Sequence, residues 1–285
     1  MKIFESIAGL QAHLDLLRGE GKVVGLVPTM GALHEGHIQL IKESISRCEI
    51  TVCSIFVNPT QFNNPDDLLK YPNQLEKDEQ MLLDAGCDIV FVPSVQEMYP
   101  EKNESLTINF GFLETVLEGA FRQGHFSGVG TVVSKLLNIV QPDLSFFGQK
   151  DLQQLAVIKK LTNDLNIRTK IISIPTVRES SGLAMSSRNQ RLTNEQKVLA
   201  AKLYQTMEKL KTRIISGTPI TEALDLAKKG LLEHREIELE YLEVVNSDSM
   251  VTVVEMSKVE NISICIAAHI GGVRLIDNLY LKQED

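Results

Sequence analysis

The feature that most constrains the fold of this 285-residue chain is a series of short, continuously apolar runs separated by helical patterns. Such runs lie at 22–28, 50–57 and 88–93, and between them apolar residues recur every three or four positions. A run without polar alternation indicates a strand that is buried on both faces, and such strands alternating with helices form parallel sheets. The first ninety residues therefore predict a βαβαβ arrangement, with ligands beyond the carboxyl ends of the strands.

The same alternation continues further along the chain. We expect a loop that feeds a helix over 124–140, a strand over 143–147, a helix over 151–165 and a strand over 170–177. The fold class is therefore α/β, with a doubly wound, Rossmann-like parallel sheet.

The pattern changes from residue 195 onward. Two helical stretches are followed by strand-like runs near 237–246, 262–268 and 273–280. One face of the first helix carries Leu199, Leu203, Met207, Leu210 and Ile214. We expect a larger Rossmann-like domain at 1–180 and a smaller α/β domain at 181–285.

Charge and composition exclude several classes of protein. The net charge of −8 and the pI near 5.4 oppose nonspecific attraction to nucleic acid or to an anionic membrane. No apolar stretch approaches the 18 or so residues that a membrane span needs, and the first residues lack a signal-peptide core. The four cysteines show no metal-site spacing, so we expect reduced thiols in a cytoplasmic protein.

The strongest functional motif is the segment 28–37, PTMGALHEGH, between the first strand and its helix. A helix N-terminus offers unpaired backbone N–H groups, and Gly31 and Gly36 let the backbone approach a ligand closely. A lone histidine most often caps a turn. Two of them, His34 and His37, at a strand-to-helix turn favour a phosphate site instead.

Two further segments follow strand ends. In 56–62, FVNPTQF, the amide of Gln61 suits a polyhydroxy acid because it both donates and accepts hydrogen bonds, although a turn-stabilising role is the alternative. In 146–154, FFGQKDLQQ, Lys150 can reach phosphates and Gln154 lies one helical turn beyond it. The alternative interpretation of Lys150 and Asp151 is a pair of solvated surface residues without a function in binding.

The last motif lies near the expected domain boundary, at 175–179 (PTVRE) and 185–189 (MSSRN). Arg188 is suited to bidentate phosphate recognition, and Ser186 and Ser187 add hydroxyl donors. A plain interdomain linker is the alternative interpretation.

The segment 28–37 resembles the His-x-Gly-His signature of adenylyl-transferring nucleotidyltransferases, and its longer form is similar to that of the pantothenate synthetase family. The four motifs match that family in order and spacing over most of residues 22–192. The chain departs from the family at Gln149, where Glu is common, and at 63–67, where the family commonly has Gly-Pro-Asn-Glu-Asp.

The resemblance implies an AMP-forming carbon–nitrogen ligase that condenses (R)-pantoate with β-alanine through a pantoyl adenylate and releases AMP and pyrophosphate. This reaction belongs to vitamin B5 and coenzyme A biosynthesis. The larger domain would bind ATP and pantoate, and the smaller one would act as a lid. ATP and Mg²⁺ would be required, and the protein would be a cytoplasmic homodimer that binds neither nucleic acid nor membrane.

The resemblance also assigns residues to roles. The catalytic set is His34, His37, Lys150, Ser186, Ser187 and Arg188. ATP would be bound by Pro28, Thr29, Met30, Gly31, His34, Gly36, His37, Gly148, Lys150, Asp151, Val177, Met185, Ser186, Ser187 and Arg188. Pantoate would be bound by Met30, Gln61 and Gln154, β-alanine by Gln61, and the metal ion by Asp78, with Tyr71 and Arg122 near the site.

Three other functions remain open at this point. One is a nucleotidyltransferase that attaches a nucleotide to a phosphate monoester and releases no AMP. Another is an aminoacyl-tRNA synthetase, although the acidic chain offers no basic stripe for RNA. The third is a nucleotide-sensing or scaffold protein on the same fold, since fold does not fix function.

Overall fold

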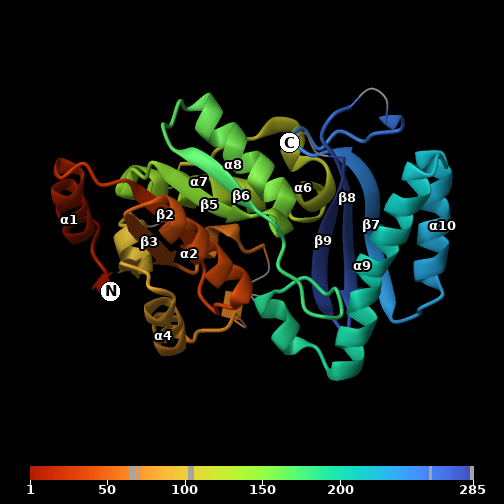
Figure 1. Cartoon of the computed structure of the whole chain (residues 1–285), viewed down its shortest axis with the longest axis horizontal. Coiled ribbons are helices and arrows are strands. Elements are labelled where there is room, and N and C mark those ends of the chain that lie inside the picture. The colour runs from red at the N-terminus through yellow and green to blue at the C-terminus, as the bar shows by residue number, and fades with distance from the viewer. Residues whose placement is uncertain (64–67, 70, 102–105, 257–258, 283–285) are drawn as a thin grey trace. The chain divides into compact units, whose positions relative to one another are not determined.

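The computed structural model, shown in Figure 1, describes residues 1–63, 68–69, 71–101, 106–256 and 259–282. Four of the five residues in the segment that departs from the family pattern after Gln61 thus lie outside the description. The chain divides into two compact units. The first comprises Met1–Gly148 and Val157–Ile174, and the second comprises Gln149–Ala156 and Pro175–Asp285.

The first unit alternates strands and helices as the apolar runs predict. Its elements are β1 (Lys2–Phe4), α1 (Ile7–Gly19), β2 (Val24–Thr29), α2 (Glu35–Arg47), β3 (Ile50–Ile55), η1 (Pro59–Gln61), α4 (Leu75–Ala85), β4 (Ile89–Phe91), α5 (Val95–Met98), η2 (Gly111–Glu114), α6 (Leu117–Phe121), α7 (His125–Val140), β5 (Leu144–Gly148) and β6 (Lys170–Ile174). Between β5 and β6, the chain forms η3 (Gln149–Asp151) and α8 (Leu152–Asp164), and the division between the units falls within α8.

The six strands form one parallel sheet in the order β1-β4-β3-β2-β5-β6. The order reverses between β2 and β5, so the carboxyl ends of these neighbouring strands flank the switch point at which such sheets bind ligands. Helix α2 packs with α4, and α7 packs with α1. The expected doubly wound sheet is confirmed. The edge strand β1 was not predicted, because three residues of which two are exposed leave no periodic signal.

Helix α7 differs from expectation at its start. The sequence predicts a loop before the helix because Gly128 and Gly130 disfavour helix formation. The helix nevertheless begins at His125. A Cβ on Gly128 would lie 2.4 Å from the carbonyl oxygen of Thr60, and one on Gly130 would lie 2.5 Å from the ring of Phe110. Tertiary packing against η1 and Phe110 therefore explains both glycines.

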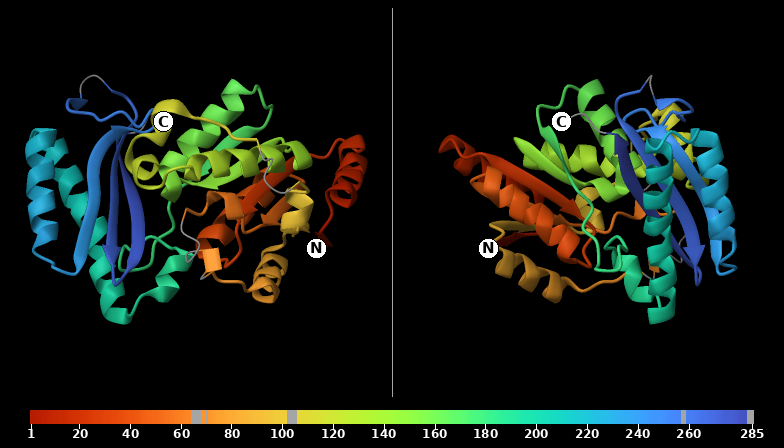
Figure 2. Two further views of the ribbon diagram at one scale, coloured as in Figure 1. Left: turned by 180° about the vertical axis from the view of Figure 1, so that it is seen from behind. Right: turned by 45° about the vertical axis from the view of Figure 1, so that its right-hand side comes forward.

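The second unit is an antiparallel sheet covered by helices. It contains η4 (Ser187–Arg191), α9 (Asn194–Ile215), α10 (Ile220–Leu232), β7 (Ile237–Asn246), β8 (Ile262–Ile270) and β9 (Val273–Lys282), with the strands in the order β7-β8-β9. Helices α9 and α10 cover one face of this sheet, as Figure 2 shows from two sides.

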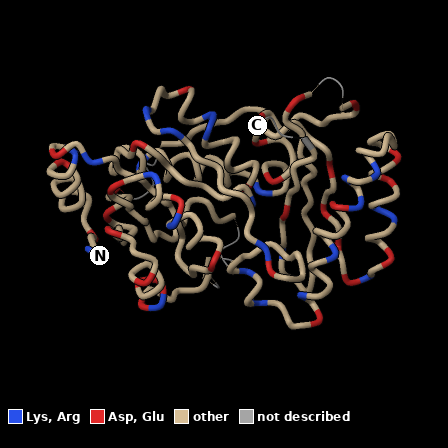
Figure 3. The backbone as a smooth tube through the Cα atoms, viewed as in Figure 1, with Lys and Arg blue, Asp and Glu red and all other residues tan. Residues whose placement is uncertain are grey.

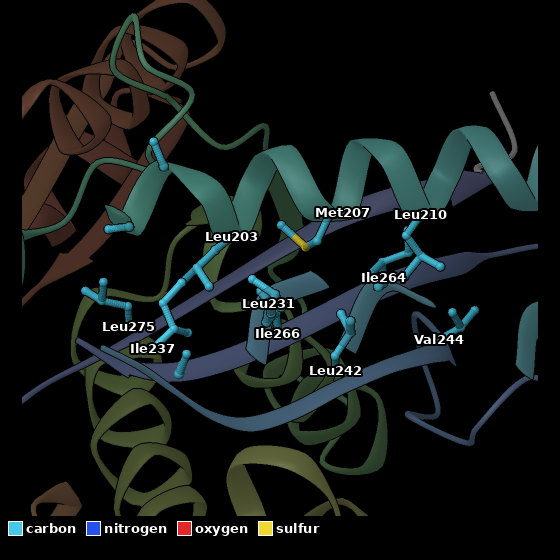
Figure 4. Close-up of a cluster of buried hydrophobic side chains, with 14 of the residues drawn as sticks. Leu203, Met207, Leu210, Leu231, Ile237, Leu242, Val244, Ile264, Ile266 and Leu275 are labelled. Atoms are coloured by element: carbon cyan, nitrogen blue, oxygen red, sulfur yellow. The ribbon is translucent and has the colours of Figure 1, made fainter. Parts of the chain in front are cut away.

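The apolar face of α9 forms the core of the second unit. Its residues Leu203, Met207 and Leu210 are at most 2% exposed and pack over Ile264 and Ile266 of β8 (Figure 4). Burying each such side chain contributes roughly 1.5–3 kcal/mol. The helical face that the sequence identifies is therefore the one that packs against the sheet.

Charged residues of both signs are interspersed along the chain (Figure 3). Among the described residues, we find no helix with the length and apolar character needed to cross a bilayer.

Candidate active site

His34 and His37 together cap the helix that follows β2. His34 is the N-cap of α2, and its Nδ1 accepts the backbone N–H of Gly36 at 3.2 Å. The Nδ1 of His37 accepts the backbone N–H of His34 at 3.3 Å, and the ring centroids lie 4.0 Å apart. The two histidines thus do cap a turn, as the simpler interpretation of the motif states, but the cap uses only one nitrogen of each ring.

This capping arrangement fixes the tautomer of both rings. A nitrogen that accepts a hydrogen bond carries no proton, so each neutral imidazole holds its proton on Nε2. Both Nε2 atoms are therefore N–H donors at the start of α2, where the helix dipole also favours an anion. Phosphate oxygens are the ligand atoms that such a pair of donors suits.

Asp78 holds the loop between β2 and α2. This carboxylate on α4 is 1% exposed, and its two oxygens accept the backbone N–H groups of Ala32 and Leu33, each at 2.8 Å. Gly31 and Ala32 have φ angles of +79° and +50°, a conformation that glycine tolerates best. Thr29 adds a further contact, since its Oγ1 accepts the N–H of Gly31 at 3.3 Å. Asp78 thereby stabilises the strained turn that places the histidines.

Gln61 and Met30, two of the residues assigned to pantoate, contact each other. The Nε2 of Gln61 lies 2.9 Å from the Sδ of Met30, and its Oε1 accepts from Asn58 Nδ2 at 3.2 Å. Gln61 is 8% exposed and Asn58 is 1% exposed. The structure therefore brings the segments after β2 and β3 together, as the parallel sheet requires.

Several residues that hold η1 were not identified from the sequence. The Oδ1 of Asn58 accepts the hydroxyl of Tyr99 at 2.9 Å, and its Nδ2 donates to the carbonyl oxygen of Gly128 at 3.1 Å. His125 Nδ1 lies 2.8 Å from the carbonyl oxygen of Gln61. Because a carbonyl only accepts, His125 carries a proton on Nδ1. The sole sequence signal for these contacts with η1 was the presence of Gly128 and Gly130 inside a helical pattern.

The two weaker candidates, Arg122 and Tyr71, also lie in the first unit. Arg122 Nη1 lies 3.0 Å from His125 Nε2, which places its guanidinium next to the support of Gln61. Tyr71 packs edge-on against Phe62 with ring centroids 5.8 Å apart.

Lys150 and Asp151 form part of η3, directly after β5. The Lys150 Nζ lies 3.6 Å from Asp151 Oδ1, and the two side chains are 19% and 46% exposed. Gln154 follows in the first turn of α8 and is partly exposed. The polar atoms of this segment are therefore accessible to a ligand.

The segment around Ser186 forms an ordered turn in the second unit. Arg178 and Ala184 form an isolated antiparallel bridge, and the N–H of Met185 donates to the carbonyl oxygen of Val177 at 2.9 Å. Ser186 then caps η4, because its Oγ accepts the N–H of Arg188 at 3.3 Å.

Three of the assigned phosphate ligands meet at one pocket. Lys150, Ser186 and Arg188 all line a pocket of the second unit, and Asp277 of β9 lies in the same wall. Two residues that are 38 positions apart in the chain thus contribute an ammonium and a guanidinium to one cavity. This pairing matches the demand of a polyphosphate for several cationic donors.

The assigned residues divide between the two units. The first unit contains Pro28, Thr29, Met30, Gly31, His34, Gly36, His37, Gln61, Asp78 and Gly148, and the second contains Lys150, Asp151, Gln154, Val177, Met185, Ser186, Ser187 and Arg188. Within the described residues, no group of three or more His, Cys, Asp or Glu side chains is placed to hold a metal ion. The metal role of Asp78 stays a prediction.

Known proteins resemble this chain over almost its entire length. A family model described as "Pantoate-beta-alanine ligase" matches residues 2–280. The chain belongs to the pantoate–β-alanine ligase family. The resemblance that the four motifs indicate is thereby confirmed.

Relatives in this family are similar in both sequence and structure. A pantothenate synthetase from Cytophaga hutchinsonii is 48% identical over 277 residues, which cover 97% of this chain and 98% of the relative. One from Bacteroides thetaiotaomicron is 44% identical over 99% of this chain and 100% of its own length. The crystal structure of pantothenate synthetase from Thermus thermophilus matches with a TM-score of 0.92 at 37% identity, covering 99% of this chain and 100% of that one.

A further family structure carries ligands. It is described as a pantoate–β-alanine ligase from Francisella tularensis complexed with "Beta-gamma ATP" and β-alanine, and it matches with a TM-score of 0.80 at 39% identity over 99% of this chain and 98% of that one. ATP is therefore bound as a substrate in the structure of this relative.

Proposed function

We propose that this chain condenses (R)-pantoate with β-alanine at the expense of ATP, through a pantoyl adenylate, and releases AMP and pyrophosphate. The observation that carries the proposal is the match of residues 2–280 to a family whose description states that ligation. The site supports it, because paired imidazole donors, a buried amide and a pocket lined by Lys150, Arg188 and Arg274 suit a nucleotide and a hydroxy acid.

Two steps account for the reaction. The pantoate carboxylate attacks the α-phosphorus of ATP, the bond to the β-phosphate oxygen breaks, and pyrophosphate leaves. The amine of β-alanine then attacks the activated carbonyl and expels AMP, with loss of one amine proton. Activation is needed because a carboxylate is resonance-stabilised and expels oxide poorly, whereas AMP leaves readily.

In the first unit, we assign the histidine pair to ATP and Gln61 to pantoate. The Nε2–H groups of His34 and His37 donate to phosphate oxygens, assisted by the N-terminus of α2. Gln61 is already oriented by Asn58 and next to Met30, so it presents its amide to pantoate and then to β-alanine. An amide held in advance loses little entropy on binding.

In the second unit, we assign the pocket cations to the triphosphate. Lys150 and Arg188 offset its negative charge, and Ser186 and Ser187 donate hydroxyl hydrogen bonds. Asp151 would bind the ribose together with Gly148, Gln154 would bind pantoate, and Val177 and Met185 would complete the ATP site. Well-aligned reactants can lower a barrier by roughly 7–11 kcal/mol, so no side-chain nucleophile is required.

Both the histidine pair and the pocket cations are thus assigned to ATP. Loss of either set is therefore expected to abolish the first step. We propose that Mg²⁺ arrives with ATP as part of the substrate, since Mg²⁺ in phosphate sites keeps several waters and few protein ligands. Asp78, whose role toward the metal ion stays a prediction, is buried and accepts two backbone N–H groups.

We further propose a homodimer in the cytoplasm. The exposed rings of Phe112 and Phe121, about half accessible at 51% and 53%, are the kind of apolar surface that subunits cover. All four cysteines are free thiols, as a reducing compartment allows. Light scattering after size-exclusion chromatography measures the mass of the particle and so tests whether the protein is a dimer.

The deciding experiment separates the two half-reactions. Protein, Mg²⁺-ATP and pantoate are mixed with and without β-alanine, and pyrophosphate and AMP are assayed separately. We expect pyrophosphate about equal to enzyme without the amine, and sustained AMP and pantothenate formation with it. Pyrophosphate release that needs no pantoate, or ATP binding without any pyrophosphate, would contradict the proposal.

A further inference from the structure

A buried asparagine of β9 holds the backbone of the lysine segment. Asn278 is 2% exposed. Its Nδ2 donates to the carbonyl oxygens of Gln149 and Lys150 at 2.9 and 2.8 Å, and its Oδ1 accepts from the Nε2 of Gln149 at 3.1 Å. The side-chain amide of Asn278 thus uses its NH₂ group and its oxygen to bind the dipeptide Gln149–Lys150. These contacts fix η3 through its backbone rather than through the ammonium of Lys150.

The preceding residue of β9 holds the other cationic segment. Both oxygens of Asp277 accept from the guanidinium of Arg178, at 2.6 and 3.0 Å, and Asp277 is 6% exposed. Arg178 also donates to the carbonyl oxygen of Asn278 at 3.1 Å and lies 3.9 Å over the ring of Tyr204. A bidentate, stacked guanidinium is a rigid anchor.

These two anchors serve the same pocket. Successive side chains of a strand point to opposite faces, so neighbouring residues of β9 can reach different segments. Asn278 fixes the segment of Lys150, whereas Arg178, through its bridge to Ala184, fixes the turn that leads to Ser186. Lys150 and Ser186 line one pocket. The spacing between its cationic groups therefore depends on two adjacent residues of β9, of which Asp277 also lies in the pocket wall and Asn278 does not line the pocket.

We propose that Asp277 and Asn278 are positioning residues that set the distance between Lys150 and the Ser186–Arg188 turn for binding of the ATP triphosphate. This inference rests on the proposed function. Groups that bind a polyphosphate in several places lose affinity when their spacing shifts by a fraction of an ångström, and rigid second contacts prevent that shift. Pantoate recognition by Gln61 does not depend on Asp277 or Asn278.

The test uses a variant that keeps the shape of the side chain. Asn278→Asp replaces the amide NH₂ with an oxygen that faces two carbonyl groups, so the Lys150 segment loses both hydrogen bonds. We expect KM for ATP in pantoate-dependent ATP–pyrophosphate exchange, and the Kd for ATP measured by calorimetry, to rise about tenfold. KM for pantoate should change by less than about twofold, since uniform effects on both substrates would indicate general disorder.

Ser263→Ala provides the matched control in the same sheet. Ser263 is fully buried on β8 and shares a hydrogen bond of 2.7 Å with Ser247. Its loss should lower the melting temperature and leave both KM values unchanged. If Asn278→Asp lowers the melting temperature but leaves KM and Kd for ATP at the wild-type values, the residue is part of the scaffold only and the inference is wrong.

A milder variant covers the case in which Asn278→Asp does not fold. Gln149→Ala removes only the hydrogen bond to Asn278 Oδ1, and we expect about a threefold rise in KM for ATP. In a double variant with Asn278→Ala, Gln149→Ala should cause no further rise in KM for ATP, because the contact between the two side chains is already lost. Fully additive effects on KM would overturn the coupling. Wild-type protein that binds ATP but forms no pantothenate would refute the proposed function, while the Kd comparison still tests the positioning.

Discussion

The imidazole rings of His34 and His37 contact each other at a tilt of 40° at the start of α2, and each uses its Nδ1 atom to accept a backbone N–H. One pair of side chains therefore both starts the helix and presents two Nε2–H donors. The two tasks involve different atoms of each ring, so they can be separated by mutation.

His37→Asn is expected to keep the cap and lose the donor. The Oδ1 of asparagine can replace Nδ1 as acceptor for the N–H of His34, but nothing replaces Nε2–H. We expect pantoate-dependent ATP–pyrophosphate exchange to fall by about 10²–10³-fold with the melting temperature nearly unchanged. His37→Ala removes both functions and should nearly abolish exchange. Near-normal exchange in His37→Asn would rule out phosphate donation by this ring.

Gly31→Ala should destabilise the loop for two reasons. Its φ of +79° disfavours a side chain, and a Cβ would lie 3.0 Å from Asp78 Oδ2 and 3.2 Å from Ile55 Cγ2. Gly21 has a φ of +77° with open space around it, so Gly21→Ala isolates the backbone effect. We expect a loss of roughly 1 kcal/mol for Gly21→Ala and at least about 2 kcal/mol for Gly31→Ala, measured by urea unfolding. Equal losses would mean that the contact with Asp78 is unimportant.

Gly128→Ala should displace η1 from α7. Its Cβ would meet the Thr60 carbonyl oxygen at 2.4 Å and Gln61 Cα at 2.8 Å. Because both obstacles are backbone atoms, the segment of Gln61 must move, and KM for pantoate is expected to rise by about tenfold or more. Gly230→Ala, in α10 with no atom nearby, should instead stabilise the protein by roughly 0.5–1 kcal/mol. An unchanged KM in Gly128→Ala would refute the role of this contact.

Tyr99 should make stability depend on alkaline pH. Burial raises the pKa of its phenol above the ordinary value of 10.0, and the hydroxyl donates to Asn58. Because the folded pKa is higher, the folded state keeps the proton after the unfolded chain has lost it. The resulting stability is fully present below pH 10 and is lost as the pH rises through the folded-state pKa.

Tyr99→Phe tests this dependence while retaining the ring beneath Lys135. The free energy of unfolding is measured in urea at several pH values from neutral to alkaline. Below pH 10, the variant should be less stable than the wild type by roughly 1 kcal/mol, and the difference should shrink at higher pH. A difference that stays constant with pH would show that the phenol does not titrate with folding.

Local signals made much of the first unit predictable. Strands buried on both faces are continuously apolar, so β2, β3 and β5 stand out in the sequence, and a parallel sheet then places the segments after them at one edge. Motifs that combine glycine with histidine, or lysine with aspartate, at those ends identified the loop of His37 and the segment of Lys150. Supporting residues such as Asn58 and His125 were missed because their partners lie 70 and 64 positions away.

The sequence by itself determined the order of strands and helices and the family, and it named the candidate residues for the chemistry, because each depends on periodicity or on a short contiguous motif. Only the tertiary structure decided which nitrogen of His34 and His37 is the donor, that Asp78 supports a turn, and that residues 149–156 belong with β9. These facts depend on hydrogen bonds between residues far apart in the chain. No local pattern encodes such contacts, since an asparagine that binds two distant carbonyl groups has the same sequence signature as one exposed to water.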